Sequence, residues 1–93
     1  MPSSVRSAVN HQLLMREVNN RRFQLAEDDL GEFLCECGAV GCIEKIFVPV
    51  GEYHRVRNDP DMFIIDSRHG PECLGWIVTR HERWAMIETA YPS

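Results

Sequence analysis

The chain has no long run of apolar residues and no excess of basic charge. No segment approaches the roughly 20 apolar residues that cross a bilayer, and residues 1–6 lack the apolar stretch of a signal peptide. We therefore expect a cytoplasmic protein with no membrane partner, in a reducing compartment that disfavours disulfides. The net charge of -4 argues against a general nucleic-acid binder, which needs a basic surface to neutralise phosphates.

Internal repeats, low-complexity segments and domain linkers are also missing. The chain has 93 residues, of which 44% are hydrophobic and 26% charged. These values are typical of one small globular domain and not of a disordered chain. We expect a single domain over residues 1–93, with frayed ends at residues 1–4 and 90–93. A domain of this size buries a limited core, and a bound metal is one common remedy.

The first part of the chain predicts one long helix over residues 5–28. This stretch contains no Gly or Pro, and Ser3 or Ser4 is a candidate N-cap. Its apolar residues form two stripes on nearly opposite sides of the helix. The first stripe comprises Val5, Val9, Leu13 and Phe23, and the second comprises Leu14, Val18 and Leu25.

We expect one stripe to cover the domain core. The other is either buried by the same domain or forms a docking surface for another chain. The candidate partner-binding residues on this helix are Leu14, Val18, Arg21, Arg22 and Leu25.

The rest of the chain predicts short strands and one further helix. Pro49 suits the first turn of a short helix that runs to Arg57. Strands are predicted at residues 33–34, 43–48, 62–65, 74–79 and 84–89. The first two strands are predicted to form one hairpin, and the last two strands another. The order of helix, two strands, helix and three strands predicts an α+β fold, in which the long helix crosses one face of a mostly antiparallel sheet.

Three cysteines lie close together in the segment Phe33-Leu34-Cys35-Glu36-Cys37-Gly38-Ala39-Val40-Gly41-Cys42. Cys35 and Cys37 would share one face of an extended segment because side chains alternate along a strand. A glycine turn would return Cys42 to the same point. Thiolates and imidazole are ligands that zinc prefers in a tetrahedral site. With His69 as the fourth ligand, the pattern predicts a zinc-knuckle hairpin whose metal contributes to folding.

The fourth ligand has competitors. Cys73 lies four residues after His69, and the other histidines are His11, His54 and His81. We expect His54 on the exposed side of the short helix, His81 in a hairpin turn and His11 exposed on the long helix. Buried free cysteines and redox chemistry are the remaining interpretations of the thiols.

The cysteine segment resembles a family of small actinobacterial proteins of uncharacterised function. That family shows a Phe-[Leu/Val]-Cys-Glu-Cys-Gly segment and a third cysteine five residues after the second. The resemblance extends over about residues 14–88. It includes Arg16-Glu17-Val18-Asn19, Glu52-Tyr53, Val56-Arg57, Asp59-Pro60, Phe63 and His69. It implies a metal site and supplies no activity.

The chain departs from that pattern in three places. Pro49 stands where a Ser or Thr caps the short helix, and Arg68 replaces the glycine before the histidine. The segment Glu72-Cys73-Leu74-Gly75 replaces a Pro-Glu-Val-Glu segment. Because Cys73 has no counterpart in the family pattern, the resemblance favours His69 as the fourth ligand.

These residues predict a zinc-stabilised protein that binds another protein as a regulator or adaptor. Three thiolates and one imidazole fill a tetrahedron and leave no position for a substrate, so we expect no enzyme. Glu36 and Glu72 are interpreted as surface residues and not as general bases. One alternative is a transcription-associated or nucleic-acid-binding zinc protein that uses Arg21 and Arg22. The other is a thiol redox switch, in which oxidation of the cysteines expels zinc.

Overall fold

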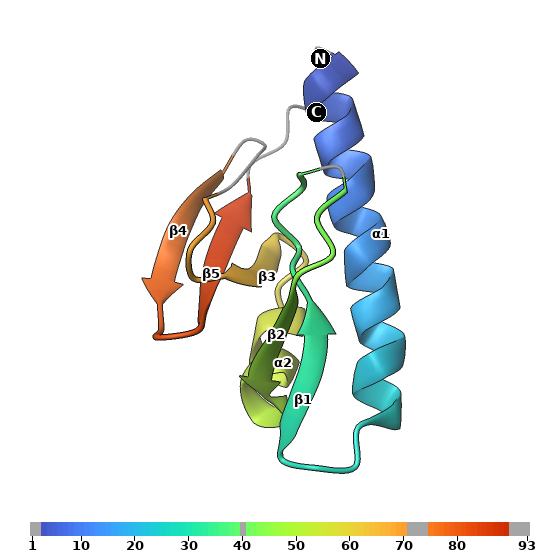
Figure 1. The fold of residues 1–93 in the computed structure, drawn as a ribbon, viewed down its shortest axis with the longest axis vertical. Helices are drawn as coiled ribbons and strands as arrows, with labels where there is room; N and C mark the ends of the chain where they lie inside the picture. The colour runs from blue at the N-terminus through green and yellow to red at the C-terminus, as the bar shows by residue number, and fades with distance from the viewer. Residues whose placement is uncertain (1–2, 40, 71–74, 90–93) are drawn as a thin grey trace.

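The computed structural model describes residues 3–39, 41–70 and 75–89, and its elements follow the predicted order (Figure 1). The elements are α1 (Ser3–Leu25), β1 (Leu30–Leu34), β2 (Lys45–Pro49), α2 (Val50–Arg57), β3 (Met62–Asp66), β4 (Gly75–Arg80) and β5 (Trp84–Thr89). The α+β class is confirmed. Residues 3 and 4 belong to α1, and the other ends expected to fray, 1–2 and 90–93, lie outside the described residues. No helix within the described segments has the length and apolar content needed to span a membrane.

The strands form two antiparallel sheets instead of the single sheet expected. β1 and β2 make the predicted hairpin, with Phe33 opposite Ile46. The second sheet has the order β3-β5-β4, and its β4–β5 pair is the second predicted hairpin. In Figure 1, α1 runs along the β1–β2 hairpin, while the three-stranded sheet lies on the other side of the hairpin.

The central strand of the core is β3, whose five residues are all buried. Its two faces contribute to different clusters. Met62 and Ile64 pack with Phe33 and Tyr53, while Phe63 and Ile65 pack with Cys35 and Cys37 among others. A strand buried on both faces is a continuous apolar run without alternation, as Met62-Phe63-Ile64-Ile65 is. One of the two cores therefore reaches directly into the cysteine segment.

Helix α1 packs against the open edge of β1 through polar side chains. Arg22 donates to the carbonyl of Glu32 at 3.3 Å, Asn19 to that of Leu34 at 2.8 Å and Gln12 to that of Glu36 at 2.9 Å. The helix rises about 15 Å over these ten residues, and a strand advances about 13 Å over four. The row of donor side chains on the helix and the row of carbonyl groups along the strand therefore have similar lengths. The helix covers a strand edge that would otherwise be open to pairing with other chains.

This contact corrects the predicted buried stripe of α1. The fully or nearly fully buried positions are Ala8, Gln12, Met15 and Asn19, which belong to neither apolar stripe. Of the first stripe, Phe23 packs against the core cluster, as predicted, but Leu13 is 36% exposed. A strand edge presents backbone N–H and C=O groups, and amide side chains satisfy these groups where leucines would not.

Candidate metal centre

The structure brings Cys35, Cys37, Cys42 and His69 together. Their sulfur and ring-nitrogen atoms all lie within 4.8 Å of one another, and Cys35 Sγ is 3.3 Å from His69 Nδ1. Cys35 and Cys37 are buried, whereas Cys42 and His69 are partly exposed. The four residues predicted from sequence therefore form one cluster that could hold a metal ion.

Residues 35 and 36 connect the two sheets. The Cys35 N–H donates to the carbonyl of Glu44 at 2.9 Å, which extends the β1–β2 hairpin by one residue. The next N–H, of Glu36, donates instead to the carbonyl of Ile64 in β3 at 2.8 Å. The chain thus changes its partner strand within one step. The thiols of Cys35 and Cys37 lie at this junction, so a metal held there would fix the two sheets to each other.

Two glycines shape the loop that returns Cys42 to the cluster. Gly38 and Gly41 have φ values of 87° and 90°, a region that other residues rarely adopt. A Cβ on Gly38 would also lie 3.2 Å from the carbonyl oxygen of Ala8 in α1. The Cys42 N–H donates to the carbonyl of Ala39 at 3.0 Å and closes a turn that contains Gly41. The turn chemistry inferred from sequence is therefore present.

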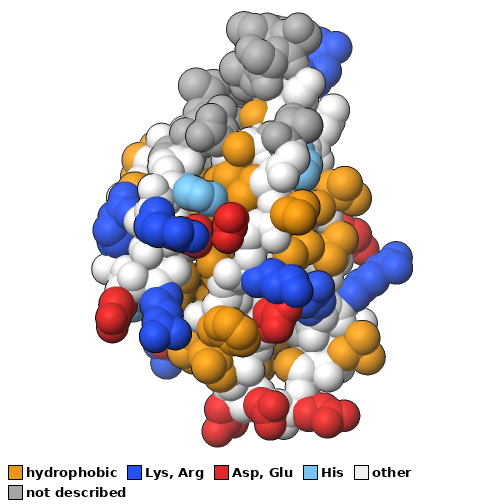
Figure 2. Space-filling view, in the orientation of Figure 1, with side chains coloured by type: hydrophobic (Ala, Val, Ile, Leu, Met, Phe, Trp, Pro, Cys, Tyr) orange, Lys and Arg blue, Asp and Glu red, His pale blue; other side chains and the backbone are white. Residues whose placement is uncertain are grey.

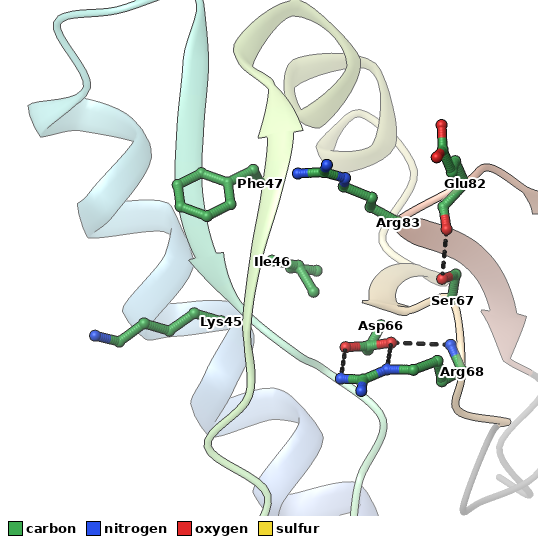
Figure 3. Close-up of a pocket in the computed structure, with 8 residues that line it drawn as sticks. All are labelled: Lys45, Ile46, Phe47, Asp66, Ser67, Arg68, Glu82 and Arg83. Carbon is green, nitrogen blue, oxygen red and sulfur yellow. Dashed lines mark hydrogen bonds and ion pairs between the residues drawn. The ribbon is translucent and has the colours of Figure 1, made fainter.

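His69 reaches the cluster from the loop after β3. Asp66 shapes this loop: its carboxylate accepts hydrogen bonds from the Arg68 backbone and guanidinium at 2.8–3.0 Å (Figure 3). The Asp66 N–H meanwhile donates to Cys35 Sγ at 3.2 Å. The same hydrogen bonding by Arg68 lowers the pKa of Asp66 to about 2. The carboxylate is therefore charged at neutral pH and holds the loop in place.

The three thiols do not ionise equally. Hydrogen bonding with Cys35 lowers the pKa of Cys37 to about 5, and the same bond, together with burial, raises the pKa of Cys35. Burial also raises the pKa of Cys42. These shifts favour negative charge on Cys37 over the other two sulfurs, and a cation bound among them would favour the thiolate form of all three.

Glu36 lies between two ligands and is fully buried, which corrects its interpretation as a surface residue. Its carboxylate accepts hydrogen bonds from Asn19 at 2.7 Å, from Arg57 at 2.8 Å and from the Ile64 N–H at 3.0 Å. Burial raises the pKa of Glu36, and the Arg57 guanidinium acts against that rise. The carboxylate thus links α1, α2 and β3 directly behind the candidate ligands Cys35 and Cys37. Alternation could have revealed this, because a residue between two ligands that share a face points the opposite way.

The competing ligands lie elsewhere or cannot be placed. His54 and His81 are exposed, as expected, and His81 stacks on Trp84. His11 is only partly exposed. Cys73 lies outside the described residues. Among the residues that the structure describes, the cluster of Cys35, Cys37, Cys42 and His69 is the one group of His, Cys, Asp and Glu placed to hold a metal.

The candidate partner-binding residues also come together. Leu14, Val18, Arg21, Arg22 and Leu25 line a shallow hollow of about 430 Å³ on the outer side of α1, together with Glu17. Leu14 is 56% exposed and Leu25 80%. The two leucines of the second apolar stripe are therefore exposed, while Val18 between them is partly buried.

No protein-family model, curated protein or solved structure matches the chain.

Proposed function

We propose that the chain is a zinc-stabilised protein-binding module, a regulator or adaptor without catalytic activity. The observation that carries the metal half of this proposal is the cluster of three thiols and one imidazole within 4.8 Å. Tetrahedral Zn–S and Zn–N bonds separate neighbouring ligand atoms by about 3.5–3.8 Å. The cluster therefore needs to contract only slightly around an ion.

Zinc suits this donor set best. Thiolate and imidazole ligands in a tetrahedron are typical of structural zinc, while carboxylate and carbonyl oxygens favour magnesium or calcium. Four protein ligands leave no open position for water or substrate, which supports a structural role. Cys35, Cys37 and Cys42 come from the first half of the chain and His69 from the second. Zinc bound here would join the two sheets and contribute its binding energy to folding.

Elemental analysis of the purified protein tests the metal. We expect one zinc ion per chain, lost in Cys35→Ser, Cys37→Ser, Cys42→Ser and His69→Gln variants. Cys73→Ser is the matched thiol control and His54→Gln the matched imidazole control, and both should keep full zinc. Another metal in the purified protein, or loss of zinc from Cys73→Ser, would contradict the assigned ligand set.

The protein-binding half of the proposal rests on the outer side of α1. Large exposed apolar residues on a small monomer mark interaction surfaces when they are contiguous. Leu14, Val18 and Leu25 line one hollow, and Figure 2 shows hydrophobic side chains gathered over the α1 side of the molecule. A photo-crosslinking residue introduced at Leu14 tests this surface in cells. Adducts at Leu14 that are absent at Val78, an exposed apolar residue on β4, support docking at α1, and equal labelling at both positions would contradict it.

A nucleic-acid function has less support. Arg22 is 3.7 Å from Glu32, and Arg68 is hydrogen-bonded to Asp66. A second hollow, of about 340 Å³, is lined by Lys45, Arg68 and Arg83 but also by Asp66 and Glu82, and Figure 3 shows the Lys45 amine pointing away from it. Positive charge is thus interspersed with carboxylates instead of forming a phosphate-binding face.

A thiol redox switch remains a second candidate because Cys42 is partly exposed beside two buried thiols. Hydrogen peroxide and two protons would convert two metal-bound thiolates into one disulfide and two waters, and the remaining ligands would release zinc. A chromogenic zinc chelator would report this release. If peroxide oxidises Cys73 but releases no zinc, the switch is excluded and the structural role stands.

A further inference from the structure

The outer side of α1 has the residue spacing of a helix-pairing seam. Leu14, Val18, Arg21 and Leu25 follow one another at intervals of four, three and four residues, the repeat that keeps one stripe of a helix facing a partner helix. We call these four residues the outer strip. All four line the same hollow, and the two leucines are more than half exposed.

The charges in and beside the outer strip are arranged to complement themselves. Glu17 lies beside the strip, one turn before Arg21 and on the same side of the helix. Within the described residues neither side chain forms an ion pair. A surface that carries an acid and a base on either side of a central point can match its own copy under a two-fold axis, because each acid then lies near a base of the second copy.

We propose that the outer strip binds the outer strip of a second copy of this chain, as an antiparallel and two-fold symmetric pair of α1 helices. This partner assignment rests on the docking surface in the proposed function and names its occupant. The symmetry axis lies level with the peptide between Asn19 and Asn20. It places Leu14 against Leu25 of the second copy and Glu17 beside Arg21 of the second copy, and each contact occurs twice.

The opposite orientation fits less well. In a parallel pair, each residue of the strip would meet its own copy. Arg21 would then face Arg21 of the second copy within the apolar seam, where like charges repel and lose water. In the antiparallel pair Arg21 faces Val18 of the second copy instead. Its aliphatic stem then covers an apolar side chain, while its guanidinium reaches Glu17 of the second copy. The sequence of the strip thus selects the antiparallel orientation.

The surface beyond Leu25 widens the contact. A neighbouring hollow of about 400 Å³ shares Leu25 and Arg22 with the first and adds Leu30 and Phe47. Leu30 and Phe47 are 53% and 46% exposed. The end of the strip that receives Leu14 of the second copy therefore borders a surface on which Leu30 and Phe47 lie among the carboxylates of Glu27, Asp28 and Glu32. The contact remains small, so we expect a reversible dimer with a micromolar dissociation constant.

Sedimentation analysis of the zinc-loaded protein across a concentration series tests the pairing. We expect a monomer–dimer equilibrium for the natural sequence. Leu25→Asp should abolish the dimer, while Val78→Asp, a matched change at an exposed apolar residue on β4, should leave it intact. Zinc content and circular dichroism verify that each variant is folded.

Charge exchange gives the sharper test. Arg21→Glu places two acids beside each other and Glu17→Lys places two bases, so each variant alone should dimerise about tenfold more weakly. An equimolar mixture of the two variants should dimerise again, because unlike charges then meet. The Glu17→Lys/Arg21→Glu double variant should recover self-association. Recovery in the mixture and in the double variant cannot arise from a general loss of stability.

Two results would overturn the pairing. One is a natural chain that stays monomeric up to millimolar concentration, and the other is a dimer indifferent to Leu25→Asp and to the charge exchange. The photo-crosslink at Leu14 separates this failure from that of the proposed function. An adduct of twice the chain mass supports self-association, while an adduct with a different protein refutes it but leaves the docking function standing. No adduct at Leu14 removes both.

Discussion

The two sides of α1 reverse the usual arrangement of an amphipathic helix. The side packed against the protein carries Gln12 and Asn19, both fully buried, while the side facing solvent carries Leu14 and Leu25. Amphipathic helices of globular proteins ordinarily place the apolar stripe inward. The difference arises because the inner side covers a strand edge and the outer side covers nothing within the described residues.

This contrast shows what holds each side in place. Hydrogen bonds are directional, so the inner side fits only when the β1 edge and residues 34–36 have their native geometry. Those residues include Cys35 and adjoin Cys37. The position of α1, and with it the presentation of the outer strip, is thereby tied to the candidate metal centre. Changes at the candidate metal centre should therefore have the largest effects on stability, and changes at the exposed leucines the smallest.

The largest effect should follow removal of the metal. Structural zinc contributes about 10–16 kcal/mol in zinc-finger peptides, against a total stability of about 5–15 kcal/mol for a small domain. Chelation of zinc, or a Cys37→Ser substitution, should therefore abolish cooperative thermal unfolding. Circular dichroism melts before and after zinc is restored measure this. An unchanged melting temperature in the chelated protein would show that α1 and the sheets dock without metal.

The next effect should come from Glu36. Glu36→Gln removes the charge that pairs with Arg57, whose side chain is only 16% exposed. An unpaired charge left in a mostly buried site costs about 3–5 kcal/mol. Denaturant unfolding should show a loss of about 3 kcal/mol while zinc content stays at one per chain, because no ligand has changed.

Glu44→Gln is the control for Glu36→Gln. Glu44 is an exposed carboxylate in the same cysteine loop, 3.7 Å from Arg68, and such pairs contribute about 0–1 kcal/mol. Equal losses in the two variants would show that the Glu36 network adds nothing specific to stability.

A smaller effect should follow a change on the inner side of α1. Asn19 donates to the Leu34 carbonyl at 2.8 Å and accepts from the Leu34 N–H at 2.8 Å. Asn19→Ala should cost about 1–3 kcal/mol because buried backbone groups lose their partners. Hydrogen exchange of the Leu34 amide should accelerate more than that of other β1 amides. Asn10→Ala, at an exposed position of the same helix, should change neither quantity, and equal behaviour of both variants would refute polar docking.

The cluster of three cysteines and one histidine could be predicted from sequence because its chemistry is local. The close spacing of three cysteines and the glycines between them indicate a metal site at Cys35, Cys37 and Cys42. The position of His69 in a loop after a buried strand indicates the fourth member. The class of fold and both hairpins followed from apolar runs and turn residues. These features depend on short stretches of chain, and all of them are present.

The remaining features depend on contacts between distant segments. Phe23 of the predicted stripe packs against the core, but most of the buried side of α1 was mispredicted because apolar periodicity assumes an apolar partner surface, and a strand edge is polar. Glu36 was mispredicted because its partners, Asn19, Arg57 and Ile64, come from three other elements. The division into two sheets occurs at residues 35–36, where successive N–H groups pair with different strands. Composition alone does not encode such a change of partner.

The smallest effect on stability should come from the outer strip. Substitution of two adjacent residues, one on each side of α1, tests the contrast between the two sides directly. Leu14 is 56% exposed and Met15 only 9%, although they are neighbours with similar helix propensity. In dilute, monomeric protein, Leu14→Ala should change the free energy of unfolding by less than about 0.5 kcal/mol, while Met15→Ala should cost about 2 kcal/mol or more. At concentrations that favour the dimer, Leu14→Ala should weaken dimerisation more than Met15→Ala does, because only Leu14 lies in the seam. A large loss for Leu14→Ala in the monomer would mean that its own domain already covers this side, and the outer strip would not be free to receive a second copy.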